Sequence, residues 1–459
     1  MGESVIMITQ TNDMTSGNST KHIFFFALPL MFGNILQQLY TMVDAIIVGR
    51  AIGVEALAAV GASDWLNWMI LGMVIGFCQG FSILISQYFG AEDYDGLRKS
   101  VAMSVILSLA IAIITTAVVL PLVRNILVIL DTPPDILSDS VAFLRIIFAG
   151  TIIVTTYNML AAFLRALGDA KTPLVAMGIG TVINIILDLV FILVFGWGVA
   201  GAAAATIAAQ LMSCVYCFMA IRKLKVLKLN RQDWIIDISL IKKLLRLGAP
   251  MAFKNAIIGV GGVIVQRVIN GFGVIFVAGF TAVMKLYGIL ELAATSFGYA
   301  VATFTGQNLG ARKYKRIKQG VFSGVKMSLS IALVISLVML VFGKLIVGLF
   351  VSGEVEEVEA VVEVAYNFLR VMSIFLVVLY LLYVYRSALQ GIGDTFTPMI
   401  SGIVELFMRV SAVLIFPAII GRSGVYYVEI VAWIGATVIL MSTYYYRIRK
   451  LLKLDNIVE

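Results

Sequence analysis

Apolar residues run along the chain in stretches of about 20 to 30, the length that a helix needs to cross a hydrocarbon core about 30 Å thick. Short segments rich in Gly, Pro and charge separate these stretches. The pattern predicts an all-α polytopic membrane protein with twelve transmembrane helices. Their expected ranges are 23–49, 57–87, 97–121, 136–163, 173–196, 199–221, 241–270, 276–306, 317–346, 360–386, 396–419 and 424–447.

Three short motifs occur twice, in the same order and 220 to 225 residues apart. This spacing predicts two copies of a six-helix unit. Because six is even, both copies enter the membrane from the same side, which predicts a pseudo-two-fold axis along the membrane normal, as in transporters whose halves rock around a central cavity. The pairs are LRALGDAKTP (164–173) with LQGIGDTFTP (389–398), YFGAEDYDGL (88–97) with NLGARKYKRI (308–317), and Leu28-Pro29 with Ala249-Pro250.

The GDxxTP pair has a structural explanation. Gly allows a turn, Thr172 or Thr397 is a suitable N-cap for the next helix, and Pro173 or Pro398 suits its first position. The repeat therefore indicates the architecture and leaves the activity open.

Basic residues indicate the topology. Of the 34 Lys and Arg, 23 lie at the termini, in every second loop or at the helix ends that adjoin them, and four lie in or beside the alternate loops. This asymmetry predicts an inner (plasma) membrane protein with both termini in the cytoplasm. The net charge of +8 thus reflects topology and does not indicate nucleic-acid binding. The expected domains are an N-terminal tail (1–22), an N-lobe (23–221), a cytoplasmic linker (222–240), a C-lobe (241–447) and a C-terminal tail (448–459).

Composition supports the membrane assignment, since 61% of residues are hydrophobic, 13% are charged and the mean hydropathy is +1.01. Soluble domains carry about 25% charged residues. Cys78, Cys214 and Cys217 fall within apolar runs. Cys214 and Cys217 form a CxxC, but the chain has no second pair and one histidine, so all three are expected to serve helix packing.

Charged residues inside a membrane are functional candidates because burying them is unfavourable. Asp44 lies in the first helix, Asn184 and Asp188 share a face of the fifth, and Ala202 and Thr206 share a face of the sixth. Asp44, Asp188 and Thr206 are expected about 9 to 13 Å from the outer helix ends. Two neighbouring carboxyls with an amide and a hydroxyl suit a proton or Na⁺, so these residues are the predicted coupling site. No other cofactor is expected.

The second half lacks this cluster. Asp44 corresponds to Ile264 or Val265, Asp188 to Val413, and Asn184 to Arg409. An alternative interpretation is that Asp44 and Asp188 pair with buried cations such as Arg145.

The second half has its own charges within the predicted helices. Glu405 and Arg409 are four apart, which favours a pair within one helix. Glu291 either pairs with Lys285 or Lys254 or lines a cavity. The full set is Lys254, Arg267, Lys285, Glu291, Glu405 and Arg409.

Uncharged polar groups beside Met and aromatic residues would suit flat, apolar cations. The alternative for most Met and Phe residues is ordinary packing. The predicted cavity residues are Gln37, Asn158, Met31, Tyr40 and Glu291. Pro29 removes a backbone hydrogen bond from the first helix and is the predicted hinge.

Several stretches together resemble the multidrug and toxic compound extrusion (MATE) family over about residues 20 to 450. They are LPLMFGNILQQLYTMVDAIIVGR, the loops after the second and eighth helices, RALGDAKTP, and NIILDLVFILVFGWGVAGAAAAT. The resemblance implies a V-shaped fold of two alternating lobes and a cation-driven antiporter that exports organic, often cationic, compounds.

The resemblance also implies residue roles. Asp44 matches the first-helix acid of the DinF-like branch, and Pro29 matches the proline where that helix bends. Gln37 matches a cavity residue near the drug. Asn184, Asp188, Ala202 and Thr206 match that branch's amino-lobe cation site. Where the NorM-like branch has an essential seventh-helix acid, this chain has Lys254-Asn255, so a second Na⁺ site in the C-lobe is not expected.

The sequence thus predicts a monomeric, non-enzymatic antiporter driven by H⁺ or Na⁺. The main alternative is a lipid-linked oligosaccharide flippase of the same superfamily, which would have a strongly basic cavity. A membrane-embedded enzyme is disfavoured because there is no metal-ligand set and no nucleophile–base pair. A channel is disfavoured by the duplicated frame.

Overall fold

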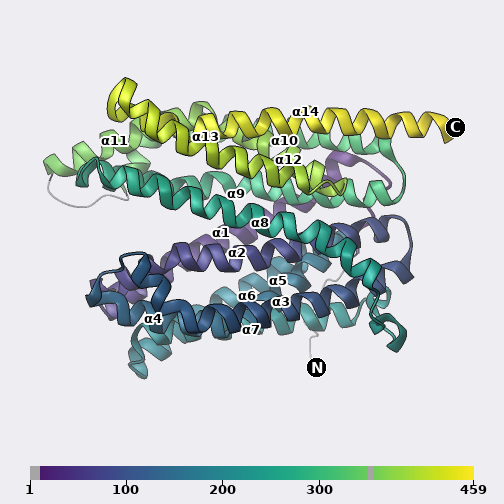
Figure 1. Cartoon of the computed structure of the whole chain (residues 1–459), viewed down its shortest axis with the longest axis horizontal. Helices are drawn as coiled ribbons and strands as arrows, with labels where there is room; N and C mark the ends of the chain where they lie inside the picture. Colours follow the sequence, from purple (N-terminus) through teal and green to yellow (C-terminus); the bar gives the residue numbers. More distant parts are fainter. Residues whose placement is uncertain (1–10, 350–354, 459) are drawn as a thin grey trace, which may run out of the picture. The chain divides into compact units, whose positions relative to one another are not determined.

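The computed structural model describes residues 11–349 and 355–458, and every regular element within them is helical (Figure 1). The first half contains α1 (Ser19–Ala51), α2 (Val54–Gly90), α3 (Tyr94–Ile129), α4 (Pro134–Ala149), α5 (Thr151–Ala166), α6 (Lys171–Asp188), the π-helical turn η1 (Leu189–Val194) and α7 (Gly198–Arg222). The 3₁₀ turns η2 (Lys225–Leu227) and η3 (Arg231–Trp234) follow. The second half contains α8 (Ile238–Asn270), α9 (Val274–Gly310), α10 (Tyr314–Gly348), α11 (Val355–Ile374), α12 (Leu376–Gly391), α13 (Phe396–Ile420), the 3₁₀ turn η4 (Gly421–Tyr427) and α14 (Val428–Val458).

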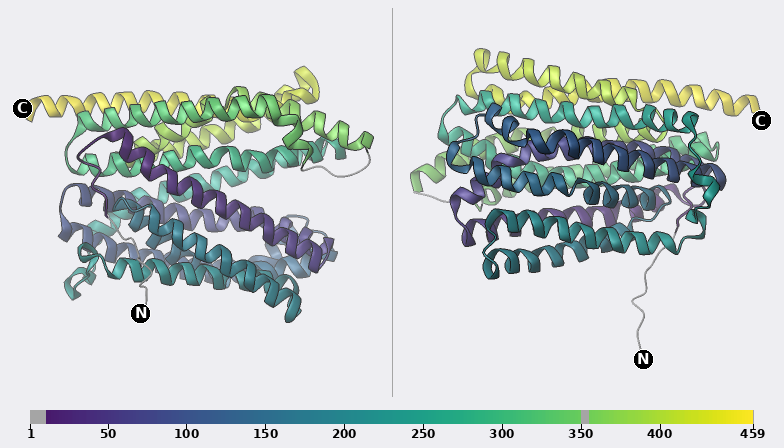
Figure 2. Two further views of the ribbon diagram at one scale, coloured as in Figure 1. Left: turned by 180° about the vertical axis from the view of Figure 1, so that it is seen from behind. Right: turned by 60° about the horizontal axis from the view of Figure 1, so that its bottom comes forward.

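Among the described residues, nine helices are long and apolar enough to cross a membrane, or eleven if each of two bent pairs counts as one span. The stretch Phe396–Leu454 counts once in that total but contains both α13 and α14. These two helices pack side by side, and α14 continues past α13 toward the C-terminus (Figures 1 and 2). The helices therefore correspond to the twelve predicted spans.

Both bent pairs occur at equivalent places in the two halves. α4 and α5 meet at 50° around Gly150, and α11 and α12 meet at 52° around Phe375. These two positions are 225 residues apart, the same spacing as the GDxxTP pair. At Gly150 a Cβ atom would collide with Ile207 of α7, so glycine permits the close approach of that helix.

The repeated GDxxTP loops fold alike, but their aspartates do the capping. Asp169 Oδ1 accepts from the backbone N–H of Thr172 at 3.0 Å, and Asp394 Oδ1 accepts from that of Thr397 at the same distance. The predicted threonine caps are wrong, because each helix begins one residue before the threonine. The prolines consequently occupy the third helical position. The glycines before the aspartates have φ of +83° and +89°, as a tight turn requires.

The described chain forms two compact units, and their boundaries along the sequence differ from those of the predicted N-lobe and C-lobe. The first holds 11–13 and 28–252, and the second holds 14–27, 253–349 and 355–458. The chain changes unit inside α1, two residues after Phe25 and two residues before Pro29, where Ala27 ends one segment, and again inside α8, two residues after Pro250. These two prolines are the pair that marks the repeat at the start of each half.

Candidate ion-coupling site

One hydrophobic cluster in the first unit joins the three helices that carry the predicted site. It contains Val48 of α1, Ile192 of η1 and Ala202 of α7, which are 0%, 6% and 0% exposed. Asp44 and Asp188 each lie one helical turn before Val48 and Ile192. The apolar cluster thus positions the two acids beside each other at the end of a dry core.

The carboxyl groups of Asp44 and Asp188 lie close enough to interact electrostatically. Asp188 is fully buried at 0% exposure, and Asn184, one turn earlier on α6, is 2% exposed. Asp44 is half-buried. The helix changes to the π-helical turn η1 immediately after Asp188, a local irregularity that is common at functional sites.

Five polar atoms in this cluster are buried and have no hydrogen-bond partner. They are Asp44 Oδ1, both amide atoms of Asn184 and both carboxyl oxygens of Asp188. Buried polar atoms are nearly always paired, because leaving one unpaired costs about 1 to 3 kcal/mol. A shared proton or a bound cation would satisfy the acceptors in this group.

The two acids have no basic partner in the described part of the chain. Among the described residues, no Lys or Arg forms an ion pair with Asp44 or Asp188. The alternative in which Arg145 compensates them is therefore wrong. No three His, Cys, Asp or Glu side chains in the described part of the chain converge to hold a metal ion. A cation here would need amide or hydroxyl ligands beside the carboxylates.

The structure places the remaining predicted site residues on α7 but does not bond them to the acids. Ala202 is fully buried, and Thr206 follows one turn later and is half-buried. Within the described residues, no hydrogen bond joins Thr206 to Asp188 or Asn184. Gln210, another turn along α7, has a buried side-chain oxygen without a partner.

Two polar residues of α2 were not among the sequence-based candidates. Asp64 lies close enough to Asp44 to interact with it electrostatically, and Tyr40 of α1 interacts with both and with Asp188. Asn67, three residues after Asp64, has a buried side-chain oxygen without a partner. The signal was available, because Asp64 falls within the predicted span 57–87 and the argument from the unfavourable burial of charge applies to it equally.

The predicted cavity residues are divided between the units. On α1, Met31 and Tyr40 are half-buried and Gln37 is exposed. Asn158 of α5 is half-buried and donates to the Val154 carbonyl of its own helix at 2.9 Å. Glu291 belongs to the second unit.

The second unit contains a separate network of buried charges. Arg386 of α12 pairs with Glu405 of α13, and Arg409 of α13 pairs with Glu429 of α14 at 2.8 Å. The predicted pair between Glu405 and Arg409 along one helix is wrong, because both residues pair with neighbouring helices. Arg409 occupies the position that corresponds to Asn184, so the equivalent place in the second half is used for structural pairing.

Glu291 also lies in this network. Its carboxyl is in hydrogen-bonding contact with Tyr287 and Tyr383, and it interacts electrostatically with Arg386. Lys254 interacts electrostatically with Glu291 and Arg386 and is 8% exposed. In the described residues Glu291 forms no ion pair with Lys285 or Lys254.

Comparison with known proteins relates the chain to a family. The family model described as MatE matches residues 29–190 and 250–415. A "Probable multidrug resistance protein YpnP" of Bacillus subtilis (strain 168) is 29% identical over 416 residues, covering 90% of this chain and 92% of its own length. From the same organism, a "Probable multidrug resistance protein YoeA" is 30% identical over 337 residues, covering 72% and 73%.

Solved structures share the fold. One, described as "Outward-facing conformation of a multidrug resistance MATE family transporter of the MOP superfamily", is 25% identical to this chain. It has a TM-score of 0.90 and covers 97% of this chain and 99% of its own.

Proposed function

The chain belongs to the MatE family of multidrug efflux transporters, and on that premise we propose that it is an antiporter that exports organic, often cationic, compounds in exchange for H⁺ or Na⁺. The observation that carries the proposal is the group of five buried, unpartnered polar atoms of Asp44, Asn184 and Asp188. Two carboxyls in contact without a basic partner need a proton or a metal cation between them.

Ion binding at this cluster changes the charge that α1 carries. When an ion is bound, the repulsion between Asp44 and Asp188 disappears and α1 can lie closer to α6. When the cluster is empty, the repulsion pushes the two helices apart. Pro29 is the proposed hinge for this movement, since the chain changes from one compact unit to the other two residues before it.

Organic substrates would meet α1 on its polar and half-buried residues. Gln37, Tyr40 and Met31 lie on this helix, and Tyr40 interacts electrostatically with Asp44 and Asp188. The affinity of a substrate that contacts Tyr40 would thus depend on whether the coupling ion is bound. By linkage, the ion must weaken substrate binding as much as the substrate weakens ion binding.

Further details of the proposal follow from the residues present. The cluster of Asp44, Asn184, Asp188, Ala202 and Thr206 favours the DinF-like branch and one coupling site in the first unit. The distribution of Lys and Arg favours the plasma membrane with both termini in the cytoplasm. We further propose that one chain suffices for transport.

The test is ethidium transport by purified protein in proteoliposomes under an imposed pH gradient or an imposed Na⁺ gradient. Uphill ethidium movement driven by one gradient supports antiport and identifies the coupling ion. Absence of transport under both gradients, with protein that elutes as a single folded species, contradicts the proposal. The flippase alternative would then be tested by translocation of a lipid-linked oligosaccharide in the same vesicles.

A further inference from the structure

One exposed face of α2 carries an acid within the membrane span. Gly61, Asp64 and Trp68 are all exposed and follow one another at intervals of three and four residues, so they lie on one face of the helix. Asp64 belongs to the apolar stretch Glu55–Gly90, which is long enough to cross a membrane. This face therefore presents a carboxylate where a membrane helix normally presents apolar side chains.

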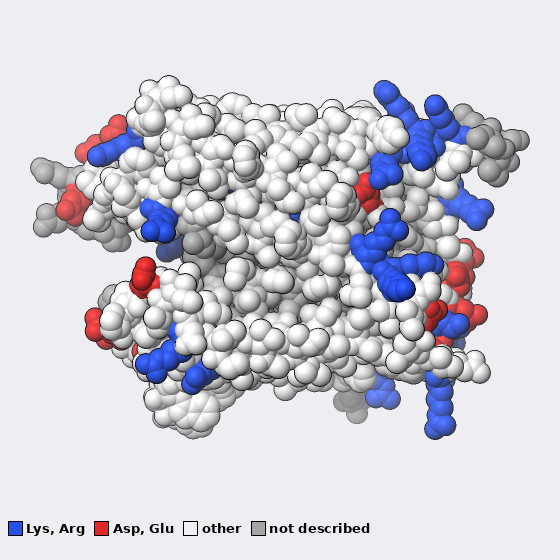
Figure 3. Space-filling view, viewed as in Figure 1, with Lys and Arg blue, Asp and Glu red and all other residues white. Residues whose placement is uncertain are grey.

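The position of Asp64 differs from that of most charged residues on the surface. On the face shown in Figure 3, Lys, Arg, Asp and Glu lie toward the ends of the helices, and the surface between them is mostly uncharged. A carboxylate in contact with hydrocarbon is unfavourable, and charged residues within spans almost always face water, a partner or a binding site. Asp64 is thus expected to face water or a ligand and not lipid.

No basic side chain compensates Asp64. In the described part of the chain, no Lys or Arg forms an ion pair with it. Its electrostatic neighbours are Asp44 and Tyr40 of α1. One coupling ion shared by Asp44 and Asp188 would leave the charge of Asp64 in place, so a second cation would be needed to neutralise it.

The surroundings of Asp64 suit an organic cation that has an aromatic part. Trp68, one turn after Asp64, is 47% exposed. The indole face attracts cations and stacks on aromatic rings. A Cβ atom added at Gly61, one turn before Asp64, would have nothing within 4 Å, so the space beside that turn is open. A proton or a metal ion would need neither the indole nor the open space.

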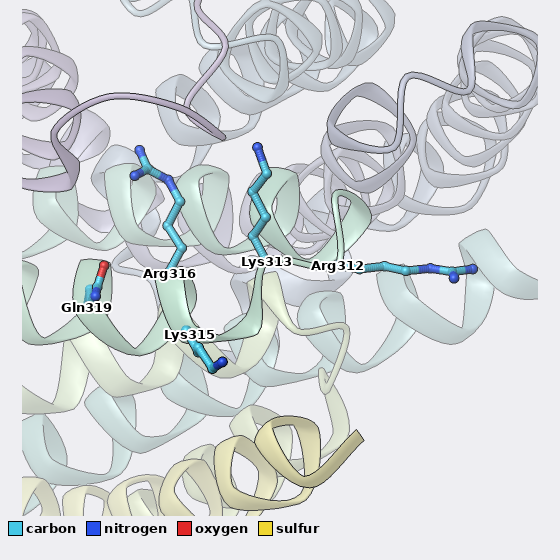
Figure 4. A pocket seen from close by; sticks show the side chains of 5 residues that line it. All are labelled: Arg312, Lys313, Lys315, Arg316 and Gln319. Atoms are coloured by element: carbon cyan, nitrogen blue, oxygen red, sulfur yellow. The ribbon is translucent and has the colours of Figure 1, made fainter. Parts of the chain in front are cut away.

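Charged groups of the second unit suit an organic cation less well. The buried acids Glu405 and Glu429 already pair with arginines. An open pocket at the start of α10 would repel a cation, because like charges line it. Its lining consists of four basic residues and an amide (Figure 4): Arg312, Lys313, Lys315, Arg316 and Gln319.

We propose that Asp64 determines the specificity of this transporter for positively charged substrates: its carboxylate binds the charge of an organic cation whose aromatic part stacks on Trp68. The inference rests on the proposed function and adds a substrate-binding residue on α2. A substrate that neutralises Asp64 removes a negative charge that attracts the coupling ion to Asp44. The two cations therefore weaken each other's binding, as exchange of one for the other requires.

The test measures binding by fluorescence, with the purified full chain in phosphatidylcholine nanodiscs and without any ion gradient. The two probes are ethidium and its uncharged phenanthridine parent, which lacks the N-ethyl group. The variants are Asp64→Asn, which keeps the shape, and Asp64→Glu, which keeps the charge. The matched control is Glu55→Gln, which removes an exposed acid from the first turn of the same helix. Size-exclusion elution and thermal unfolding verify that each variant folds.

We expect Asp64→Asn to bind ethidium at least tenfold more weakly and to bind the uncharged parent within twofold of the wild type. Two unit charges about 4 Å apart attract each other by a factor of about five in water and about a thousand at an effective dielectric constant of about 20. An exposed carboxylate within a span lies between these limits. Asp64→Glu should recover most of the affinity for ethidium, and Glu55→Gln should bind both probes within twofold of the wild type.

Three results would overturn the inference. Equal weakening of both probes by Asp64→Asn would show an effect of shape, and unchanged ethidium binding would show that Asp64 does not hold the substrate. Wild-type protein that binds no ethidium would also contradict it. Failure of the proposed antiport is a separate result, because wild-type protein that binds ethidium through Asp64 and moves it under neither gradient would reject the antiport and retain this site.

Discussion

Asp188→Asn is the substitution that separates the coupling chemistry from the packing of the first unit. Asn has nearly the same shape as Asp, so the buried space beside Ile192 and Ala202 stays filled. What changes is the charge, because one of the two carboxyls in contact is lost. Asn184 on the same helix cannot replace it, since a neutral amide attracts a cation far less than a carboxylate does.

The magnitude follows from the loss of one of the two carboxylates that would face the cation. Two unit charges about 4 Å apart interact with about 4 kcal/mol at an effective dielectric constant of about 20. A cation that loses one of its two carboxylates therefore loses attraction of that order, which corresponds to about a thousandfold in affinity. At physiological ion concentrations such a change leaves the site empty. Asp188→Asn should consequently abolish gradient-driven transport.

The assay is ion-gradient-driven ethidium transport in proteoliposomes, measured beside a control that removes an acid elsewhere. Asp135→Asn removes an exposed charge at the start of α4 and should transport at the wild-type rate. Ethidium binding by Asp188→Asn is measured separately by fluorescence anisotropy. We expect binding at least as tight as that of the wild type, because the substrate contacts stay and no bound ion weakens substrate binding.

Uphill transport by Asp188→Asn at more than a tenth of the wild-type rate would refute the reasoning. The ion would then bind elsewhere, and the network of Glu291 and Lys254 in the second unit would become the next candidate. A variant that neither binds ethidium nor unfolds near the wild-type temperature is uninformative about coupling, so Asp44→Asn is prepared in parallel. The same loss is expected of it, since Asp44 supplies the other carboxyl.

Three further substitutions test the packing and are followed by thermal unfolding in detergent. Gly168→Ala should destabilise the fold by at least 1 to 2 kcal/mol, because φ is +83° and a Cβ would collide with the backbone carbonyl of Asn12. Its control is Gly178→Ala, which has open space around the added Cβ and should not lower the melting temperature. Asp169→Ala should cost about 0.5 to 2 kcal/mol by removing the cap of α6, and a melting temperature equal to the wild type would show that the cap contributes nothing. Glu405→Gln should cost about 3 to 5 kcal/mol by leaving Arg386 buried without its partner. The double variant Glu405→Leu with Arg386→Met should recover most of that loss. If it recovers none, the pair does more than neutralise charge.

The spans and their duplication were predictable because the membrane imposes them. Each hydrophobic run must be long enough to cross the bilayer, and a duplicated unit repeats its loop motifs. Pro121 shows the limit of this approach, since the predicted span 97–121 ends there whereas α3 continues to Ile129. A proline in a membrane helix does not end the helix where neighbouring groups satisfy the freed carbonyl.

The similar depth of Asp44 and Asp188 was an expectation from the sequence, but depth does not fix the lateral distance between two helices, so their proximity had to come from the packing of α1 and α6. The partners of Glu405 and Arg409 were not predictable, since spacing within one helix cannot reveal which neighbouring helix supplies a closer charge. The bends at Gly150 and Phe375 were equally hidden, because an apolar run has the same composition whether it is straight or bent.

The two halves share structural features but carry chemically different buried residues at equivalent positions. Both use a proline where the chain changes unit, a GDxxTP cap and a bend at the same position, so the repeat supplies the moving frame. In the first half, the side chains of Asn184 and Asp188 are buried without partners. Of their counterparts, Arg409 pairs with Glu429 and Val413 is buried and apolar. A symmetric pair of ion sites would move both halves alike. In the proposed mechanism, placing the unsatisfied charge in one half would let the ion act on α1 alone, while the paired charges of the other half remain fixed.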